Sequence, residues 1–98
     1  MNQTRRKEII EVLEKEKLTV KQLADLFQVE VRFILEDLRH ISQSLKPMHK
    51  KIEQLFPVCN SCGFVFRSRK KFSRPSKCPK CRSEDITEPV YWIKVNKP

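Results

Sequence analysis

Four cysteines, arranged as two closely spaced pairs, constrain the fold of this chain more than any other feature of its sequence. Cys59 and Cys62 form one Cys-x-x-Cys unit, and Cys78 and Cys81 form another, with fifteen residues between the units. Two such units at this spacing are typical of a tetrahedral site in which four thiolates hold one ion. We expect Gly63, the only glycine, to supply the positive φ that the turn after Cys62 requires. Four protein ligands leave no open coordination position, so the sequence predicts one structural Zn²⁺.

Two disulfides or four unrelated thiols are the competing interpretations of these cysteines. The first residues of the chain are polar and charged, and no apolar segment follows them as in a secretory signal. No apolar run approaches the length of a membrane span. We therefore expect a cytoplasmic protein without membrane contact, in which thiols stay reduced and close cysteine pairs bind metal.

The first half of the chain has the apolar periodicity of three helices. They are expected over residues 3–15, over residues 20–27 and from the residues after 30 to about residue 45. Thr19 and Gln22 have the spacing of a capping box, which marks the start of the second helix. The apolar residues of the third helix follow one another at helical intervals: Ile34, Leu35, Leu38, Ile41 and Leu45.

The segment Leu18–Val29, followed by Ile34–Leu38, resembles the helix-turn-helix of winged-helix transcription regulators. The resemblance implies that the third helix enters the major groove of double-stranded DNA. The side of this helix opposite its apolar stripe carries Arg32, Arg39 and Gln43, which can reach base edges or phosphates.

Other residues of the third helix weaken this interpretation. Glu36 shares the polar side, and Glu30 and Asp37 add negative charge, so the helix is close to neutral. A solvated face of mixed charge is therefore the competing interpretation. Phe33 also lies on the polar side, and we expect it to pack against the other half of the chain or a partner.

The positive charge of the chain is concentrated in its second half. There are 21 Lys and Arg against 12 Asp and Glu, a formal net charge of +9. The first 47 residues contribute +1 and the remainder contributes +8. Pro47 ends any helix that reaches it. We therefore expect two small units, a helical domain over residues 1–47 and a zinc ribbon over residues 48–98.

A strongly basic loop over residues 67–77 separates the two cysteine pairs and is followed by Lys80 and Arg82, so that residues 67–83 hold eight cations and no acidic residue. Phe72 lies among these cations, and such a mixture suits phosphate contacts combined with base stacking. A solvated loop that offsets the charge of the metal centre is the competing interpretation. The loop cations that we expect to contact nucleic acid are Arg67, Arg69, Lys70, Lys71, Arg74 and Lys77.

The cysteine units resemble the knuckles of rubredoxin and of zinc ribbons, most closely over Cys59–Phe66. The second unit continues with Arg82 where rubredoxin has a glycine, which favours zinc over an electron-transferring iron. Val90–Val95 is predicted as the closing strand of the ribbon, paired antiparallel with Ile52–Val58. The small core of the ribbon is expected to include Trp92.

The predicted fold class is therefore α+β, an N-terminal three-helix winged helix-turn-helix with a C-terminal zinc ribbon in the wing position. This arrangement resembles a family of small archaeal winged helix-turn-helix proteins with a C-terminal rubredoxin-like zinc ribbon, which are described as predicted transcriptional regulators. The resemblance implies DNA binding and transcription regulation.

These observations favour a DNA-binding transcriptional regulator that uses the helix-turn-helix and the basic ribbon together, with double-stranded DNA as its partner. The alternative is a protein-interaction module that docks on RNA polymerase or on a partner regulator. A rubredoxin-like redox protein is a third interpretation. The sequence contains no catalytic constellation and no motif for a small-molecule substrate, so we do not expect an enzyme.

Overall fold

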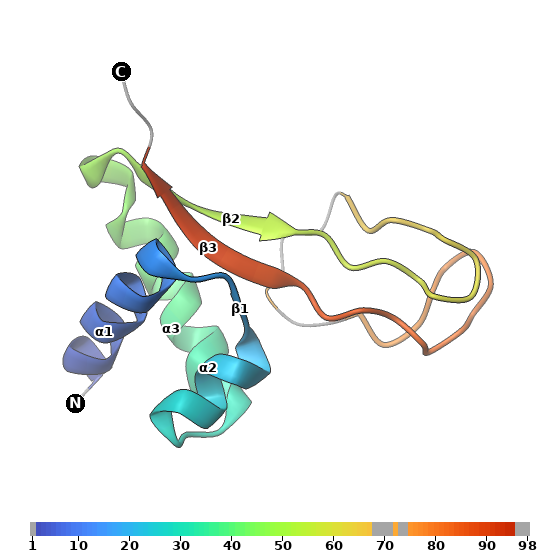
Figure 1. Ribbon diagram of the computed structural model, residues 1–98, viewed down its shortest axis with the longest axis horizontal. Helices are drawn as coiled ribbons and strands as arrows, with labels where there is room; N and C mark the ends of the chain where they lie inside the picture. The colour runs from blue at the N-terminus through green and yellow to red at the C-terminus, as the bar shows by residue number, and fades with distance from the viewer. Residues whose placement is uncertain (1, 68–71, 73–74, 96–98) are drawn as a thin grey trace.

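The computed structural model describes residues 2–67, 72 and 75–95. Helix α1 (Asn2–Lys15) is followed by the short strand β1 (Leu18–Thr19), then by α2 (Val20–Phe27) and α3 (Val31–Ser44). A 3-10 turn, η1 (Lys46–Met48), leads into β2 (Lys50–Leu55), and β3 (Val90–Val95) follows the cysteine-containing segment. The fold is α+β, with three helices, an antiparallel sheet and a ribbon that extends from one end of the sheet (Figure 1).

Local hydrogen bonds fix both ends of α2. The Thr19 hydroxyl oxygen accepts a hydrogen bond from the Gln22 amide at 3.1 Å, and the Gln22 side-chain oxygen accepts one from the Thr19 amide at 2.8 Å. This is the predicted capping box, which is confirmed. At the other end Gln28 adopts a left-handed conformation with φ of 55°, and its amide donates to the last turn of the helix.

The sheet has the order β1-β3-β2, so that β3 is paired with an antiparallel neighbour on each side. The predicted pairing of the last strand with the segment before the cysteines is confirmed by the register of Ile93 opposite Ile52. Side chains alternate along a strand, and Tyr91 and Ile93 are buried against the helices. Trp92 lies on the other face of the sheet, where the Lys17 ammonium is 4.6 Å from its ring centroid.

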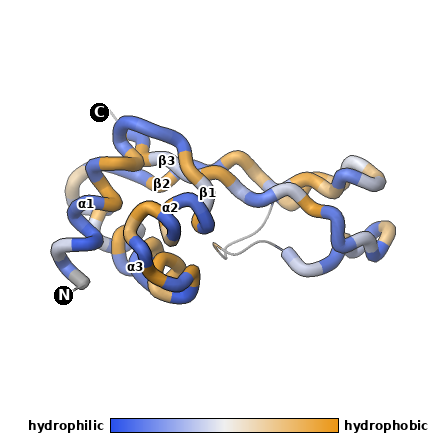
Figure 2. Tube along the Cα trace, turned by 60° about the horizontal axis from the view of Figure 1, so that its bottom comes forward, coloured by the Kyte–Doolittle hydropathy of each residue, from blue (hydrophilic) through white to orange (hydrophobic). Residues whose placement is uncertain are grey.

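The place of β3 in the core differs from the sequence expectation, in which this strand closed the core of the ribbon. Its inward side chains belong to the helical core instead, because β3 also pairs with β1, which lies between two helices. Figure 2 shows hydrophobic segments where the helices meet the sheet and the ribbon extending beyond them. The buried residues of this core are Ile9, Leu13, Val20, Leu23, Ala24, Ile34, Leu38, Ile41, Leu45, Tyr91 and Ile93.

A buried ion pair joins α1 to α3. The Asp37 side chain is 1% exposed, and it accepts hydrogen bonds from the Arg5 Nε at 2.5 Å and the Arg6 Nε at 3.0 Å. The hydrogen bond to Asp37 raises the pKa of Arg5 above its ordinary value. Asp37 was counted among the acidic residues that make α3 close to neutral, but its carboxylate is buried and paired with α1, so it adds no negative charge to the exposed face of the helix.

Phe33 on α3 is 37% exposed, and two guanidinium groups lie near its ring. The Arg32 guanidinium is 4.9 Å from the ring centroid and the Arg5 guanidinium is 5.8 Å from it. These cation–π contacts account for an aromatic residue on the polar side of the helix. Phe33 was expected to pack against the second half of the chain or a partner, and in the structure both contacting guanidinium groups come from the first half.

Candidate metal centre and nucleic-acid interface

The two cysteine units fold into knuckles with the same backbone hydrogen bonds. In the first, the Cys59 amide donates to the Phe64 carbonyl and the Gly63 amide donates to the Cys59 carbonyl, both at 2.9 Å. In the second, the Cys78 amide donates to the Ser83 carbonyl at 2.9 Å, and the Arg82 amide donates to the Cys78 carbonyl at 2.8 Å. Each knuckle therefore turns its two sulfur atoms toward the other knuckle.

Direct contacts hold the two knuckles together. The Asn60 amide donates to the Asp85 carbonyl at 2.8 Å, and the Asn60 side chain donates to the Asp85 carboxylate at 3.0 Å. The Ser61 hydroxyl donates to the Ser83 hydroxyl oxygen at 2.8 Å. An antiparallel bridge joins Cys59 to Ile86. The first knuckle is thus docked on the segment that follows the second.

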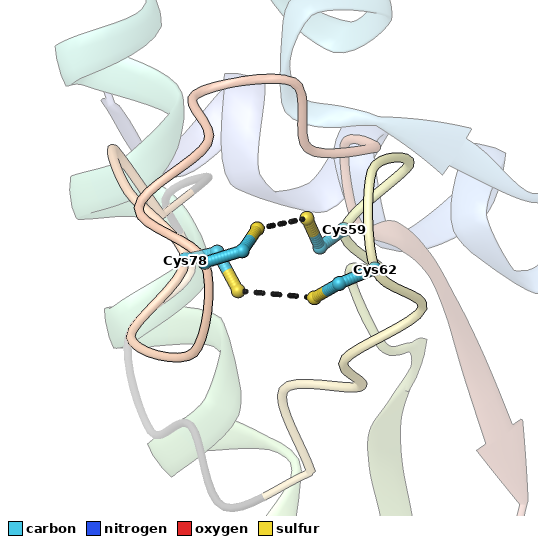
Figure 3. Close-up of side chains that lie close together, drawn as sticks. Cys59, Cys62 and Cys78 are labelled. Atoms are coloured by element: carbon cyan, nitrogen blue, oxygen red, sulfur yellow. Dashed lines mark hydrogen bonds between the residues drawn. The ribbon is translucent and has the colours of Figure 1, made fainter.

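The four sulfur atoms are close enough together to bind one ion. All four lie within 4.8 Å of one another, with Cys59 Sγ 3.5 Å from Cys81 Sγ and Cys62 Sγ 3.6 Å from Cys78 Sγ (Figure 3). A tetrahedron with Zn–S bonds of about 2.3 Å has S–S edges of about 3.8 Å, so this geometry fits zinc. The four cysteines, as predicted, form the site of one structural Zn²⁺.

The four thiols do not ionise alike in the absence of an ion. Burial raises the pKa of Cys59, but hydrogen bonds from the amides of Cys62 and Ser61 and with the sulfur atoms of Cys81 and Cys62 together lower it to about 6. The Ser83 amide acts in the same direction on Cys81, yet burial and the three neighbouring sulfur atoms raise its pKa to about 12. Four thiolates this close repel one another, and a bound divalent cation stabilises all four together.

Residues 57–96 match the family described as the PF0610 rubredoxin-like zinc beta-ribbon domain, and residues 4–52 match the one described as PF0610-like, N-terminal. The solution NMR structure of protein PF0610 from Pyrococcus furiosus is 37% identical in sequence to this chain, with a TM-score of 0.78. The match covers 93% of this chain and 89% of that one. The chain belongs to the PF0610-like family. No curated protein gives a significant match.

In this PF0610-like chain, the turn after each knuckle requires a left-handed residue. Gly63 has φ of 83°, as predicted, and its Cα position is open, with no atom within 4 Å of an added Cβ. The need for glycine there is therefore conformational rather than steric. Arg82, at the corresponding position of the second knuckle, has φ of 63°.

The residues predicted to read DNA from α3 are on its exposed side. Arg32, Arg39 and Gln43 are all exposed, but Arg32 is already engaged, since its Nε lies 3.1 Å from a Glu30 carboxylate oxygen. Among the described residues, no carboxylate forms an ion pair with Arg39. Of the three residues, Arg39 and Gln43 are therefore more available than Arg32 to contact a DNA groove.

The basic loop is only partly described. Arg67 and Lys77, at its two ends, are exposed and lack an ion pair with any described carboxylate. The other predicted contact residues lie outside the described residues: Arg69, Lys70, Lys71 and Arg74.

Phe72 has a different role from the expected one. Its ring lies 5.4 Å from the Tyr91 ring, edge to face, and the Tyr91 hydroxyl donates a 2.8 Å hydrogen bond to its carbonyl oxygen. Phe72 therefore packs on the helical core rather than standing ready to stack on bases. This packing brings the loop back to the helices.

The sequence did not indicate a groove beside this contact. It encloses about 210 Å³ and is mainly apolar. Because its sides come from α2, α3 and the segments around Phe72 and before β3, no local pattern could have identified it. The residues that line it are Val20, Lys21, Val31, Leu35, Phe72, Glu88 and Pro89.

Within the described residues, no helix is both long and apolar enough to cross a membrane.

Proposed function

We propose that this chain is a non-catalytic, DNA-binding transcriptional regulator, built as a winged helix-turn-helix in which the zinc ribbon replaces the tip of the wing. The order of the elements supports this. A winged helix follows its third helix with a hairpin. Here α3 is followed by β2 and β3, which pair with each other and are joined by residues 56–89. The ribbon therefore leaves the sheet at the far end of these two strands, where the tip of a wing would lie (Figure 1).

The observation that carries the proposal is the presence of exposed, unpaired cations on α3 and on the ribbon. Arg5, Arg6 and Lys50 are used inside the helical unit, where each binds a carboxylate. Arg39 on α3 has no such partner among the described carboxylates. Neither do the described cations between β2 and β3, which are Arg67, Lys77, Lys80 and Arg82. Cations that are exposed and unpaired are available to neutralise phosphates, which supplies most non-specific affinity for DNA.

A titration against three nucleic acids tests the proposal. We expect the zinc-loaded chain to bind duplex DNA more tightly than single-stranded DNA or double-stranded RNA, since an α-helix enters the B-form major groove but not the narrow A-form one. Arg39→Ala should weaken binding to duplex DNA. Lys46→Ala in η1, which also removes one exposed positive charge, is the matched control. Equal or tighter binding to either of the other two nucleic acids would overturn the proposal.

A second candidate, docking on a protein of the transcription machinery, is favoured by the apolar groove. Val31, which lines the groove, is 42% exposed. If this candidate is right, purified RNA polymerase binds the nuclease-treated chain and Val31→Asp abolishes that binding. Loss of the complex on nuclease treatment alone would argue for bridging by nucleic acid.

A further inference from the structure

The second zinc knuckle contains a residue that its backbone does not favour. The two knuckles share their hydrogen-bond pattern, and Arg82 stands where the first has Gly63. A left-handed backbone brings a Cβ close to the following carbonyl oxygen, a cost that glycine avoids. Arg82 nevertheless adopts the left-handed conformation, with φ of 63°. Arg82 thus adds a guanidinium group to the second knuckle at a conformational cost that Gly63 avoids in the first.

A second cation accompanies it. Lys80 occupies the position that Ser61 holds in the first knuckle, and both Lys80 and Arg82 are exposed on either side of Cys81. Neither forms an ion pair with a carboxylate of the described residues. Of the acidic residues that follow, Asp85 is engaged by Asn60. The tip of the ribbon thus presents two free cations on one knuckle and none on the other.

The metal centre itself does not account for these cations. Four thiolates and one Zn²⁺ have a net charge of −2, which a nearby cation could offset. The first knuckle, however, holds two of the same four sulfur atoms with Ser61 and Gly63 in the matching positions and has no cation there. Lys80 donates a hydrogen bond to Cys78 Sγ from its backbone amide, at 3.4 Å. Any residue other than proline could form that bond at this position, so it does not require the lysine side chain.

We propose that the second knuckle is the phosphate-contacting tip of the ribbon, with Lys80 and Arg82 holding phosphates of duplex DNA. Cys62 and Cys81 are exposed at the tip of the ribbon, and their negatively charged sulfur atoms repel a phosphate group. A cation between the sulfur atoms and the phosphate offsets this repulsion. Lys80 and Arg82 flank Cys81 in the sequence and can supply these cations. This inference rests on the proposed function, and it assigns two contact residues outside the loop of residues 67–77.

The test measures DNA affinity and metal retention on the same full-length, zinc-loaded variants. Arg82→Gly removes the cation and relieves the backbone, whereas Arg82→Lys keeps both the charge and the strained backbone. Lys94→Ala is the matched control, because Lys94 is exposed near the end of β3 that lies away from the ribbon. Binding of a labelled random duplex is followed by fluorescence anisotropy from about 50 to about 200 mM salt.

We expect Arg82→Gly to bind duplex DNA about fivefold to tenfold more weakly, with a salt dependence shallower by about one ion. Arg82→Lys and Lys94→Ala should stay close to the wild type. Zinc retention against a chelator and the thermal midpoint of Arg82→Gly should equal or exceed the wild-type values, since glycine suits the backbone.

Two results would overturn the inference alone. The first is wild-type affinity in Arg82→Gly, and the second is earlier zinc loss in that variant, which would assign Arg82 to the metal site. If the wild-type chain itself shows no salt-dependent binding to duplex DNA, the proposed function fails and this inference fails with it.

Discussion

The Tyr91 hydroxyl donates a hydrogen bond of 2.8 Å to the carbonyl oxygen of Phe72, nineteen residues earlier in the chain. Tyr91 is fully buried in the helical core, and Phe72 belongs to the loop between the two zinc knuckles. The ribbon is therefore attached to the helical unit in two places, through the paired strands β2 and β3 and through this contact. A ribbon held in this way can act together with α3 on one ligand.

Removing the hydroxyl in Tyr91→Phe should destabilise the protein by about 1 kcal/mol, because the Phe72 carbonyl loses its donor while the ring packing remains. For a chain of this size the thermal midpoint should fall by about 4–8 °C. Thermal unfolding of the zinc-loaded protein measures this. Zinc affinity should stay unchanged, since Tyr91 is not a ligand; a weakened metal site would show that the contact supports the knuckles instead.

The buried pair between α1 and α3 makes a larger contribution. Asp37→Asn should lower the free energy of unfolding by about 3 kcal/mol, because it leaves Arg5 and Arg6 without the carboxylate that neutralises them. Glu36→Gln, one residue earlier and exposed, is the control and should change stability by less than about 0.5 kcal/mol. Urea denaturation distinguishes the two variants, and equal effects would contradict the assigned role of Asp37.

Zinc removal should separate the two units. Among the described residues, the helices and β3 share a core of eleven buried residues, whereas the ribbon relies on a few apolar contacts such as the edge-to-face pair of Phe64 and Phe66. A ribbon this small needs its metal. After chelation, amide exchange should become fast over residues 57–89 while helical circular dichroism persists. Complete loss of helical signal would mean that the helices depend on the ribbon for folding.

Local patterns were sufficient for much of this structure. The capping box at Thr19, the helical intervals of α3 and the cysteine spacing each depend on residues near one another in sequence, and each predicted its element. Asp37 was misjudged although it lies three residues after Ile34 and four before Ile41, on the buried stripe of the helix. That spacing is a signal that sequence reasoning could have used.

The remaining differences are non-local. The partners of Asp37 lie on α1, about thirty residues away, and nothing in either segment specifies the other. The packing of Phe72 on Tyr91 and the apolar groove likewise depend on how the ribbon returns to the helices. The alternating pattern of β3 predicted a strand but could not tell whether its inner side faced the ribbon or the helices.

The salt dependence of binding to duplex DNA tests the central claim, that unpaired cations on α3 and the ribbon bind one duplex together. The described cations available for this are Arg39, Arg67, Lys77, Lys80 and Arg82. If about four of them neutralise phosphates, the association constant should fall about two orders of magnitude between about 50 and about 200 mM salt. An affinity that does not change over this range, or no binding at the lower salt concentration, would contradict the claim.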